Sequence, residues 1–203
     1  LDVPTDCPQR DERMGWTGDA QVFAPTASFN MYTPAFFEKY LYDMRLEQRE
    51  LGGAVPHVVP DVIDQIERVK RGNPNPTSYG SCGWGDAAIG IPWTMYEFYG
   101  DREMLARQYE NMKMWTDWIR EQDEAHCGGR RLWTCGFHYA DWLALDNPVQ
   151  DSSFGGTDPY YIASAYYYSA ARTTSRAAKV LGRDEEAAEY AKLAEEVREA
   201  FRK

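Results

Sequence analysis

Apolar residues recur every three or four positions along most of the chain, which is the spacing of one face of an α-helix. The first clear stripe consists of Phe37, Tyr40, Leu41 and Met44. Two longer stripes consist of Leu105, Tyr109, Met112, Trp115 and Ile119, and of Tyr190, Leu193, Ala194, Val197 and Phe201. Residues 85–99 and 160–181 have similar spacing, and the second range is apolar on nearly all sides, so we expect it to be buried on more than one face. The pattern predicts an all-α chain.

Short sequence signals mark the ends of these helices. Thr33-Pro34 and Asp158-Pro159 each pair an N-cap residue with the ring that fits the first helical position. Gly100 and Gly182 follow apolar helices and are typical C-terminal stops. Residues 19–31 also have helical spacing but contain Pro25, so we expect a kinked or late-starting helix there.

Two long stretches lack the helical pattern. Residues 54–83 alternate proline, asparagine and glycine with few apolar runs, and residues 127–151 are also irregular. Within the second stretch, Arg131–Cys135 is a candidate short strand. Connections of this length are usually either functional or disordered.

Two joints between predicted helices resemble each other. Residues 99–105 (YGDREML) and 181–187 (LGRDEEA) each link an apolar helix to an amphipathic one. This similarity indicates an internal repeat of helical hairpins, and three such hairpins arise along the chain. The first helix of each is the more apolar, as expected for inner helices that face a closed ring and outer helices that face water.

The composition narrows the possible functions. With 203 residues and 43% hydrophobic content, the chain can bury a full core, and we interpret it as one domain. A formal net charge of −10 disfavours nucleic acid, whose phosphates need a basic surface, and suits a neutral ligand. The sequence shows no apolar run long enough to predict a membrane span and no signal-peptide layout. Because the chain begins at a dense motif without a methionine, we expect a piece of a longer protein and leave its localisation open.

The cysteines are few and do not follow a usual metal pattern. Four cysteines are too few for a disulfide scaffold in a chain of this size. His126, Cys127, Cys135 and His138 lie close in sequence but match no common zinc spacing, so we expect neither a metal nor a cofactor. For Cys127 and Cys135, a bridge in an exported protein and two free thiols in an intracellular one both remain open.

The densest chemistry lies in residues 6–19, DCPQRDERMGWTGD. This run contains four carboxylates, two arginines and one tryptophan. A sugar pocket needs such acids, guanidinium groups that can donate two hydrogen bonds at once, and a flat apolar ring face. A solvated charged loop that caps the next helix is the simpler alternative. The shape-setting residues Pro8, Gly15 and Gly18, together with Trp16, favour a site loop.

This run closely resembles the signature of bacterial α-L-rhamnosidases of glycoside hydrolase family 78, D-C-P-x-R-D-E-R-x-G-W-T-G-D. Residues 83–87 (GWGDA) and 140–144 (ADWLA) resemble the family's later W-x-D and G-D-W-L segments, with Ala140 where the family usually has glycine. The resemblance covers essentially the whole chain. It implies an (α/α)6 toroid of six hairpins, of which residues 1–203 would be the N-terminal half, about three hairpins, truncated at the C-terminal side and also at the N-terminal side.

The resemblance also implies an activity, an inverting hydrolysis of terminal α-L-rhamnose from glycosides or polysaccharides. Glu12 resembles the family's general acid, and Asp6, Arg10 and Asp19 resemble residues that hydrogen-bond the rhamnose hydroxyls. The general base resembles a glutamate of the later half of the toroid. We therefore expect this chain alone to be inactive, and its partners to be a rhamnose-containing carbohydrate and the remaining half of the toroid.

Further candidate ligands of the sugar come from the irregular stretches. Trp16, Trp84 and Trp142 lie at irregular segments or helix starts, so we expect them to form a stacking wall for the sugar ring and its methyl group. Asp86 and Asp141 are candidate substrate ligands, although Asp86 could equally be a first-turn acid at a helix dipole. Three tryptophans that fall within helical stripes are expected in the core: Trp93, Trp115 and Trp118.

Two other functions remain as alternatives. One is another toroid glycosidase or a polysaccharide lyase, but lyases often bind acidic sugars in basic grooves, which the charge of −10 disfavours. The other is a non-catalytic domain of helical hairpins that only binds partners. An acid-rich loop such as residues 6–19 has no evident use in that second alternative.

Overall fold

The computed structural model describes residues 13–64, 79–147, 149 and 152–203. Within these ranges the named helices are α1 (Thr17–Asn30), α2 (Pro34–Glu50), α4 (Ala87–Tyr99), α5 (Arg102–His126), α6 (Pro159–Leu181) and α7 (Asp184–Phe201). The described residues contain no strand, only two isolated bridges, which join Trp16 to Val58 and Pro56 to Tyr79. The prediction of an all-α chain is confirmed.

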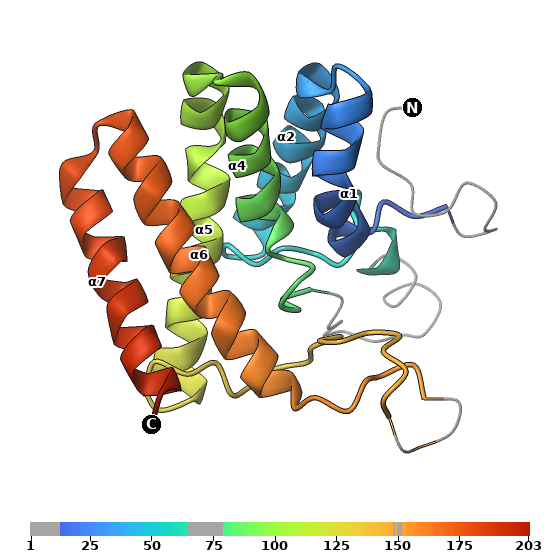
Figure 1. The fold of residues 1–203 in the computed structure, drawn as a ribbon, viewed down its shortest axis with the longest axis vertical. Helices are drawn as coiled ribbons and strands as arrows, with labels where there is room; N and C mark the ends of the chain where they lie inside the picture. Colours follow the sequence, from blue (N-terminus) through green and yellow to red (C-terminus); the bar gives the residue numbers. More distant parts are fainter. Residues whose placement is uncertain (1–12, 65–78, 148, 150–151) are drawn as a thin grey trace.

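The helices are arranged in consecutive pairs (Figure 1). α4 packs along α5, and α6 packs along α7. α1 and α2 are joined by a short turn, and they pack against the next pair, α1 on α4 and α2 on α4 and α5. The first helices α1, α4 and α6 begin at the same end of the molecule, and the irregular segments gather there. The long connections are therefore brought together at one end of the helical scaffold.

The helix ends follow the sequence signals. Gly100 adopts a left-handed φ of 63° after α4, and the Asp101 carboxylate then accepts a hydrogen bond from the Met104 backbone N–H at 2.8 Å. The Asp158 carboxylate accepts from the Tyr160 N–H at 2.7 Å at the start of α6. These bonds satisfy N–H groups that have no partner inside a helix. The predicted stops at Gly100 and Gly182 and the predicted caps at Asp101 and Asp158 are confirmed, whereas the Thr33 side chain makes no capping hydrogen bond at the start of α2.

The first helix begins earlier than expected. α1 starts at Thr17, whose backbone N–H donates to the His57 carbonyl at 3.0 Å. Pro25 lies within the helix and is exposed, so its ring projects into solvent and removes a single backbone donor. The expectation of a late start was wrong because tertiary contacts with the segment near His57 fix the first turn.

The candidate strand at Arg131–Cys135 does not form. The Trp133 backbone N–H donates to the Ser164 hydroxyl at 3.0 Å, and the Thr134 N–H donates to the Cys127 sulfur at 3.3 Å. Arg131 itself has a φ of 61°, which is left-handed rather than extended. Side chains therefore take the backbone bonds that a neighbouring strand would have supplied.

α6 is buried along one face only, contrary to the expectation from its composition. Its buried residues are Ala163, Ser164, Tyr167, Ala170, Ala171, Thr174, Ala177 and Ala178. These mostly small side chains let α5 and α7 pack against it, whereas Arg172 and Arg176 on another face are exposed to solvent. None of the helices within the described ranges combines the length and apolarity needed to cross a membrane.

Three tryptophans pack together in the core around α5. Trp115 and Trp118 stack with their ring centroids 5.2 Å apart, and Trp133 meets Trp115 edge-on at 5.8 Å. Trp115 and Trp133 are fully buried. Burial of rings of this size contributes strongly to the stability of the helical scaffold. We call Trp115, Trp118 and Trp133 the core tryptophans.

Candidate active site

The three tryptophans predicted to form a stacking wall meet at the ring of Tyr139. The Tyr139 centroid lies 4.5 Å from Trp84, 5.4 Å from Trp142 and 6.1 Å from Trp16. The contacts with Trp16 and Trp142 are edge-to-face, and the Trp84 ring is tilted. Side chains from three separate connections thus come together in one place. We call Trp16, Trp84, Trp142 and Tyr139 the aromatic wall.

Trp16 is held by a strand-like pairing with the first long connection. The Val59 N–H donates to the Gly15 carbonyl at 2.9 Å, and the Thr17 N–H donates to the His57 carbonyl at 3.0 Å. Residues 54–59, predicted as part of an irregular connection, are buried. This segment fixes the chain on both sides of Trp16 and so fixes the direction of its ring.

Trp84 is held by close packing against the start of α1. A Cβ atom on Gly18 would lie only 2.9 Å from two ring atoms of Trp84, so only glycine fits at position 18 with the ring in this place. The Gly83 N–H donates to the Asp86 carboxylate at 2.8 Å and closes the turn that carries Trp84. Gly18 leaves room for the Trp84 ring, and Gly83 closes the turn before it. Both glycines therefore help to set the position of Trp84.

Asp86 is buried below this turn. Its second carboxylate oxygen accepts from the Trp115 ring N–H at 3.2 Å, while the first is bound by the Gly83 N–H. Burial raises the pKa of Asp86 to about 7, against the opposing effect of these hydrogen bonds. Both oxygens are engaged by protein donors, and Asp86 directly precedes α4, which favours the alternative of an acid at the start of that helix. Its role as a substrate ligand stays a prediction.

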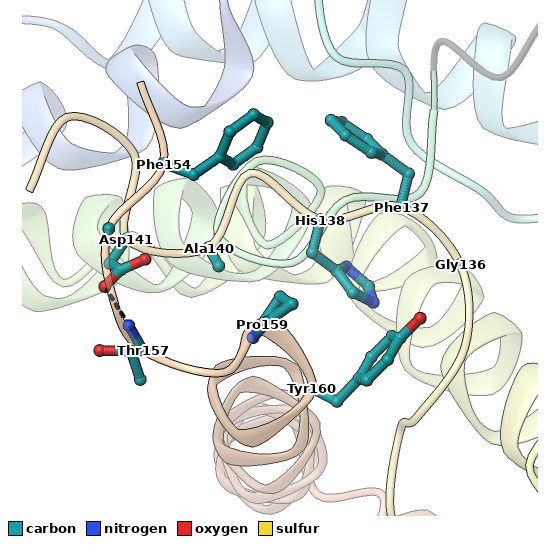
Figure 2. Close-up of a pocket in the computed structure, with 10 residues that line it drawn as sticks. Gly136, Phe137, His138, Ala140, Asp141, Phe154, Thr157, Pro159 and Tyr160 are labelled. Atoms are coloured by element: carbon teal, nitrogen blue, oxygen red, sulfur yellow. Dashed lines mark hydrogen bonds between the residues drawn. The ribbon is translucent and has the colours of Figure 1, made fainter. Parts of the chain in front are cut away.

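Trp142 lies in a segment with unusual backbone geometry. Ala140 and Leu143 have left-handed φ values of 53° and 64°. Asp141, between them, accepts a hydrogen bond from the Thr157 N–H at 3.1 Å (Figure 2). Slight burial opposes ionisation, but the bonds with Thr157 outweigh it and lower the pKa of Asp141 below its usual value. The side chain is therefore a carboxylate at neutral pH.

A cavity of about 320 Å³ lies beside the aromatic wall. Its lining residues are Gly136, Phe137, His138, Ala140, Asp141, Phe154, Gly155, Thr157, Pro159 and Tyr160. Figure 2 shows Phe137 and Phe154 along one side, His138 and Tyr160 on another, and the bonded pair Asp141 and Thr157 opposite them. The cavity lies between the loop that carries Asp141 and the start of α6.

His138 fixes the position of the loop before Tyr139. Its Nδ1 accepts from the Cys82 N–H at 3.1 Å, and its Nε2 then donates to the Cys135 carbonyl at 3.0 Å. Burial lowers the pKa of His138 to about 4, so the ring is neutral. With both nitrogens bound to backbone groups, His138 is a structural link rather than a metal ligand.

The neighbouring cysteines lie in contact as thiols. The sulfur atoms of Cys127 and Cys135 are 2.7 Å apart, and Cys127 is buried while Cys135 is partly exposed. Among the described residues, no group of three or more histidine, cysteine, aspartate or glutamate side chains is arranged to hold a metal ion.

The remaining predicted site residues belong to the motif of residues 6–19, the end of which overlaps the start of α1. Asp19 is in the first turn of α1 and is exposed. Asp6, Arg10 and Glu12 lie outside the described residues, so their predicted roles stay predictions. The chain enters the described region at Arg13, three residues before Trp16, which connects this motif directly to the aromatic wall.

Comparison with known proteins identifies the family. Residues 1–203 match the family model of the bacterial alpha-L-rhamnosidase 6 hairpin glycosidase domain. The chain belongs to this family. This rhamnosidase-type domain is an (α/α)6 toroid, and the pairs α1–α2, α4–α5 and α6–α7 supply three of its hairpins.

The similar rhamnosidases are much longer than this chain. An alpha-L-rhamnosidase of Formosa agariphila is 38% identical over 201 residues, which cover 99% of this chain and 20% of the relative. One of Streptomyces avermitilis is also 38% identical over 201 residues, which cover 99% of this chain and 17% of the relative. The chain thus spans about a fifth of the length of these relatives.

Solved rhamnosidase structures share the fold. The crystal structure of the Streptomyces avermitilis alpha-L-rhamnosidase complexed with L-rhamnose matches with a TM-score of 0.80 and 36% identity, over 99% of this chain and 17% of that one. The native enzyme of Aspergillus terreus matches with a TM-score of 0.84 and 34% identity, over 99% and 22% of the two chains.

The sequence analysis missed several residues of this candidate site. Tyr139, on which the three tryptophans converge, was not singled out, nor were Phe137 and Phe154. His57 was also missed, although its ring lies 5.0 Å from that of Tyr139. A usable signal existed, since Phe137-His138-Tyr139 is a run of three rings immediately before the segment that resembles the family.

Proposed function

We propose that the protein containing this chain is an inverting α-L-rhamnosidase that removes terminal α-L-rhamnose from glycosides or polysaccharides. The observation that carries this proposal is the convergence of Trp16, Trp84 and Trp142 on Tyr139 in a chain of the rhamnosidase family. A wall of rings assembled from three connections is typical of a ligand site rather than of a helical core.

The aromatic wall suits rhamnose because this sugar is neutral and carries a methyl group. Trp142 remains 39% exposed, and Trp16 and Trp84 are partly buried, so each of the three rings keeps some surface that a ligand could contact. Ring faces attract the apolar C–H groups of a sugar, and a methyl group adds to the apolar area that is buried. The net charge of −10 carries no penalty for a neutral ligand.

Polar groups of residues 6–19 and of the loop after Tyr139 would supply hydrogen bonds to the sugar. We propose that Asp6, Arg10 and Asp19 bind the rhamnose hydroxyls. Asp141 is ionised and can accept bonds from a hydroxyl while it holds Thr157. Carboxylate and guanidinium groups form the strong, directional bonds that distinguish one sugar from another.

Glu12 is the proposed general acid. It would protonate the glycosidic oxygen as the bond from that oxygen to the anomeric carbon breaks. A second carboxylate would take a proton from a water molecule that attacks the anomeric carbon from the opposite face, which inverts the configuration. In inverting enzymes the two carboxyl groups are roughly 6.5–9.5 Å apart. We propose that this base comes from a part of the protein outside the chain, which would leave the chain alone inactive.

Replacement of Glu12 tests the proposal. In the full-length protein, Glu12→Gln should lower turnover of a chromogenic α-L-rhamnoside by roughly 10²–10⁴-fold, because glutamine keeps the shape but cannot donate the proton. Glu103→Gln, at an exposed position on α5, is the matched control and should leave turnover unchanged. The first anomer of rhamnose released, followed by NMR, should be β. Full activity of Glu12→Gln, or preference for a different α-glycoside, would contradict the proposal.

A further inference from the structure

The cavity next to the aromatic wall is separated from it by two phenylalanines. Phe137 contacts Tyr139 with centroids 4.9 Å apart, and Phe154 contacts Trp142 at 5.1 Å. The two phenylalanines are 6.3 Å from each other and meet edge-on. Both line the cavity as well. A group bound in the cavity would therefore be separated from a sugar on the aromatic wall only by the side chains of Phe137 and Phe154.

The size and the apolar lining of the cavity suit a single ring. Its volume of about 320 Å³ is at the lower end of the range of roughly 300–1,000 Å³ for small-molecule sites. Phe137 and Phe154 are 47% and 41% exposed, so their rings are open to a ligand. Gly136, Ala140 and Gly155 contribute almost no side-chain volume, which leaves the space free.

The polar lining excludes anions. Asp141 is ionised, and His138 is neutral with both ring nitrogens bound to backbone groups. No lysine or arginine lines the cavity. The cavity therefore carries a net negative charge, which repels a phosphate or an acidic sugar and accepts hydrogen bonds from hydroxyl groups.

The two loops that enclose the cavity are tied to each other. The Leu143 N–H donates to the Ser153 carbonyl at 2.7 Å, and the Asn147 side-chain amide donates to the Phe154 carbonyl at 2.7 Å. The Asp141 carboxylate holds the Thr157 N–H on the other side. A site whose walls are fixed before binding loses less entropy when a ligand enters.

We propose that this cavity is a second carbohydrate subsite, which holds one neutral sugar ring, the one to which the terminal rhamnose is attached. Phe137 and Phe154 contact the apolar face of this ring, and Asp141 accepts a bond from one of its hydroxyls. The proposal rests on the proposed function and narrows the substrate to rhamnose linked to a neutral sugar.

Two substrates with different leaving groups test the subsite. α-L-Rhamnosyl fluoride has no second ring, whereas an α-L-rhamnosyl-glucose disaccharide would fill the cavity. In the full-length protein, Phe154→Ala should raise the KM for the disaccharide by about 5–10-fold, as expected for the loss of one ring contact. The kcat/KM for the fluoride should stay unchanged. Phe154→Tyr keeps the ring and should retain the original KM.

A matched control excludes a general effect of removing an exposed phenylalanine. Phe98 on α4 is 45% exposed and is not part of the cavity lining, so Phe98→Ala should leave both substrates unaffected. The melting temperature of each variant, measured by circular dichroism, shows that it is folded. Equal effects of Phe154→Ala on the fluoride and the disaccharide, or no effect on either, would overturn the subsite.

An aryl α-L-rhamnoside distinguishes a sugar from an aromatic leaving group. If Phe154→Ala raises the KM for the aryl rhamnoside and not for the disaccharide, the cavity binds an aromatic group and the proposal is wrong. If the unaltered protein hydrolyses none of these substrates, the proposed function fails. Calorimetric titration of a methyl glucoside into the unaltered protein and into Phe154→Ala then decides the subsite separately, because weaker binding to the variant supports it and equal or absent binding overturns it.

Discussion

The core tryptophans and the aromatic wall use the same type of ring for different purposes. Trp115 and Trp133 are sealed inside the scaffold, and the Trp115 ring N–H is bound by the buried Asp86 carboxylate. Trp142, in the wall, stays 39% exposed, and Tyr139 joins it to rings from two other connections. Trp115 and Trp133 in the core are closed off from solvent, whereas Trp16, Trp84 and Trp142 in the wall each keep part of their ring surface accessible.

The two groups also differ in how the backbone places them. Trp115 and Trp118 lie on the regular α5 helix, so helical geometry alone sets their spacing. Trp142 follows Ala140 and precedes Leu143, both of which have left-handed φ values. Irregular backbone is costly, and it is found where a particular arrangement of side chains is needed. The comparison indicates that the helices supply stability and the connections supply the site.

Truncation of one ring from each group should give the largest contrast. Trp115→Ala should lower the free energy of unfolding by about 3–5 kcal/mol, because it opens a cavity, removes the stacking partner of Trp118 and leaves an Asp86 oxygen without its donor. Trp142→Ala should cost less than about 1.5 kcal/mol, since its ring is already partly exposed, but should weaken binding of rhamnose. Urea unfolding measures the loss of stability in each variant, and titration with rhamnose measures the loss of binding. Equal losses of stability would remove the distinction between the two groups.

His138 lies between the two groups and should connect the stability of the protein to pH. Its ring contacts Trp133 at 4.5 Å, and the next residue is Tyr139. The pKa of His138 is about 4 in the folded protein, because of burial, against about 6.5 when unfolded. The unfolded state therefore binds more protons between these values, and the contribution of His138 to stability is present above pH 6.5 and is lost as the pH falls towards 4.

Comparison with a variant isolates this contribution. The unaltered protein should lose on the order of 2–3 kcal/mol more between pH 6.5 and pH 4 than His138→Asn does, as the shift in pKa requires. The difference between the two proteins is the quantity to measure, because Asp86 and Glu47, whose pKa values are raised to about 7 by burial, change stability with the opposite sign. Parallel pH profiles of the two proteins would show that His138 is not the group that titrates.

Relief of backbone strain next to Trp142 should give the smallest change in the free energy of unfolding. Ala140 has a left-handed φ of 53°, a conformation that costs an alanine roughly 1–2 kcal/mol and costs glycine nothing. After the greater flexibility of glycine in the unfolded chain is subtracted, Ala140→Gly should raise the free energy of unfolding by about 0.5–1 kcal/mol. The corresponding change at Ala170, which is helical and buried in α6, should instead destabilise the protein. Denaturant midpoints of the two variants test this difference in sign.

The contrast between the two groups of tryptophans could be predicted from the sequence. Trp115 and Trp118 fall within the helical periodicity of α5; Trp115 is fully buried in the core as expected, and Trp118 is partly buried and packs against the core. Trp16, Trp84 and Trp142 fall outside such stripes, and the structure brings them together. Local periodicity reports whether a helix determines the direction of a side chain, but it does not account for every tryptophan. Trp133 lies in an irregular connection and is fully buried, whereas Trp93, which falls within a helical stripe, is only partly buried.

Other features depend on contacts between distant parts of the chain and could not be predicted locally. Tyr139 joins the wall because two long-range hydrogen bonds hold its loop: the Cys82 N–H donates to His138, 56 residues away, and the Tyr139 N–H donates to the Ser81 hydroxyl. The candidate strand at 131–135 has suitable residues but no partner strand, and its Trp133 N–H donates to the Ser164 side chain instead. The restriction of burial to one face of α6 could not be predicted, because hydropathy counts its many alanines as apolar wherever they lie on the helix.

The contact between Gly18 and Trp84 has a consequence for the evolution of the family. Position 18 can gain a side chain only if the ring at position 84 moves or becomes smaller, because a Cβ atom at 18 would lie 2.9 Å from that ring. The two signature segments, which contribute positions 18 and 84 and so meet across 66 residues of sequence, are therefore fitted to each other. Relatives should change both positions together, and a chimaera that takes only one segment from a divergent relative should place its tryptophan wrongly.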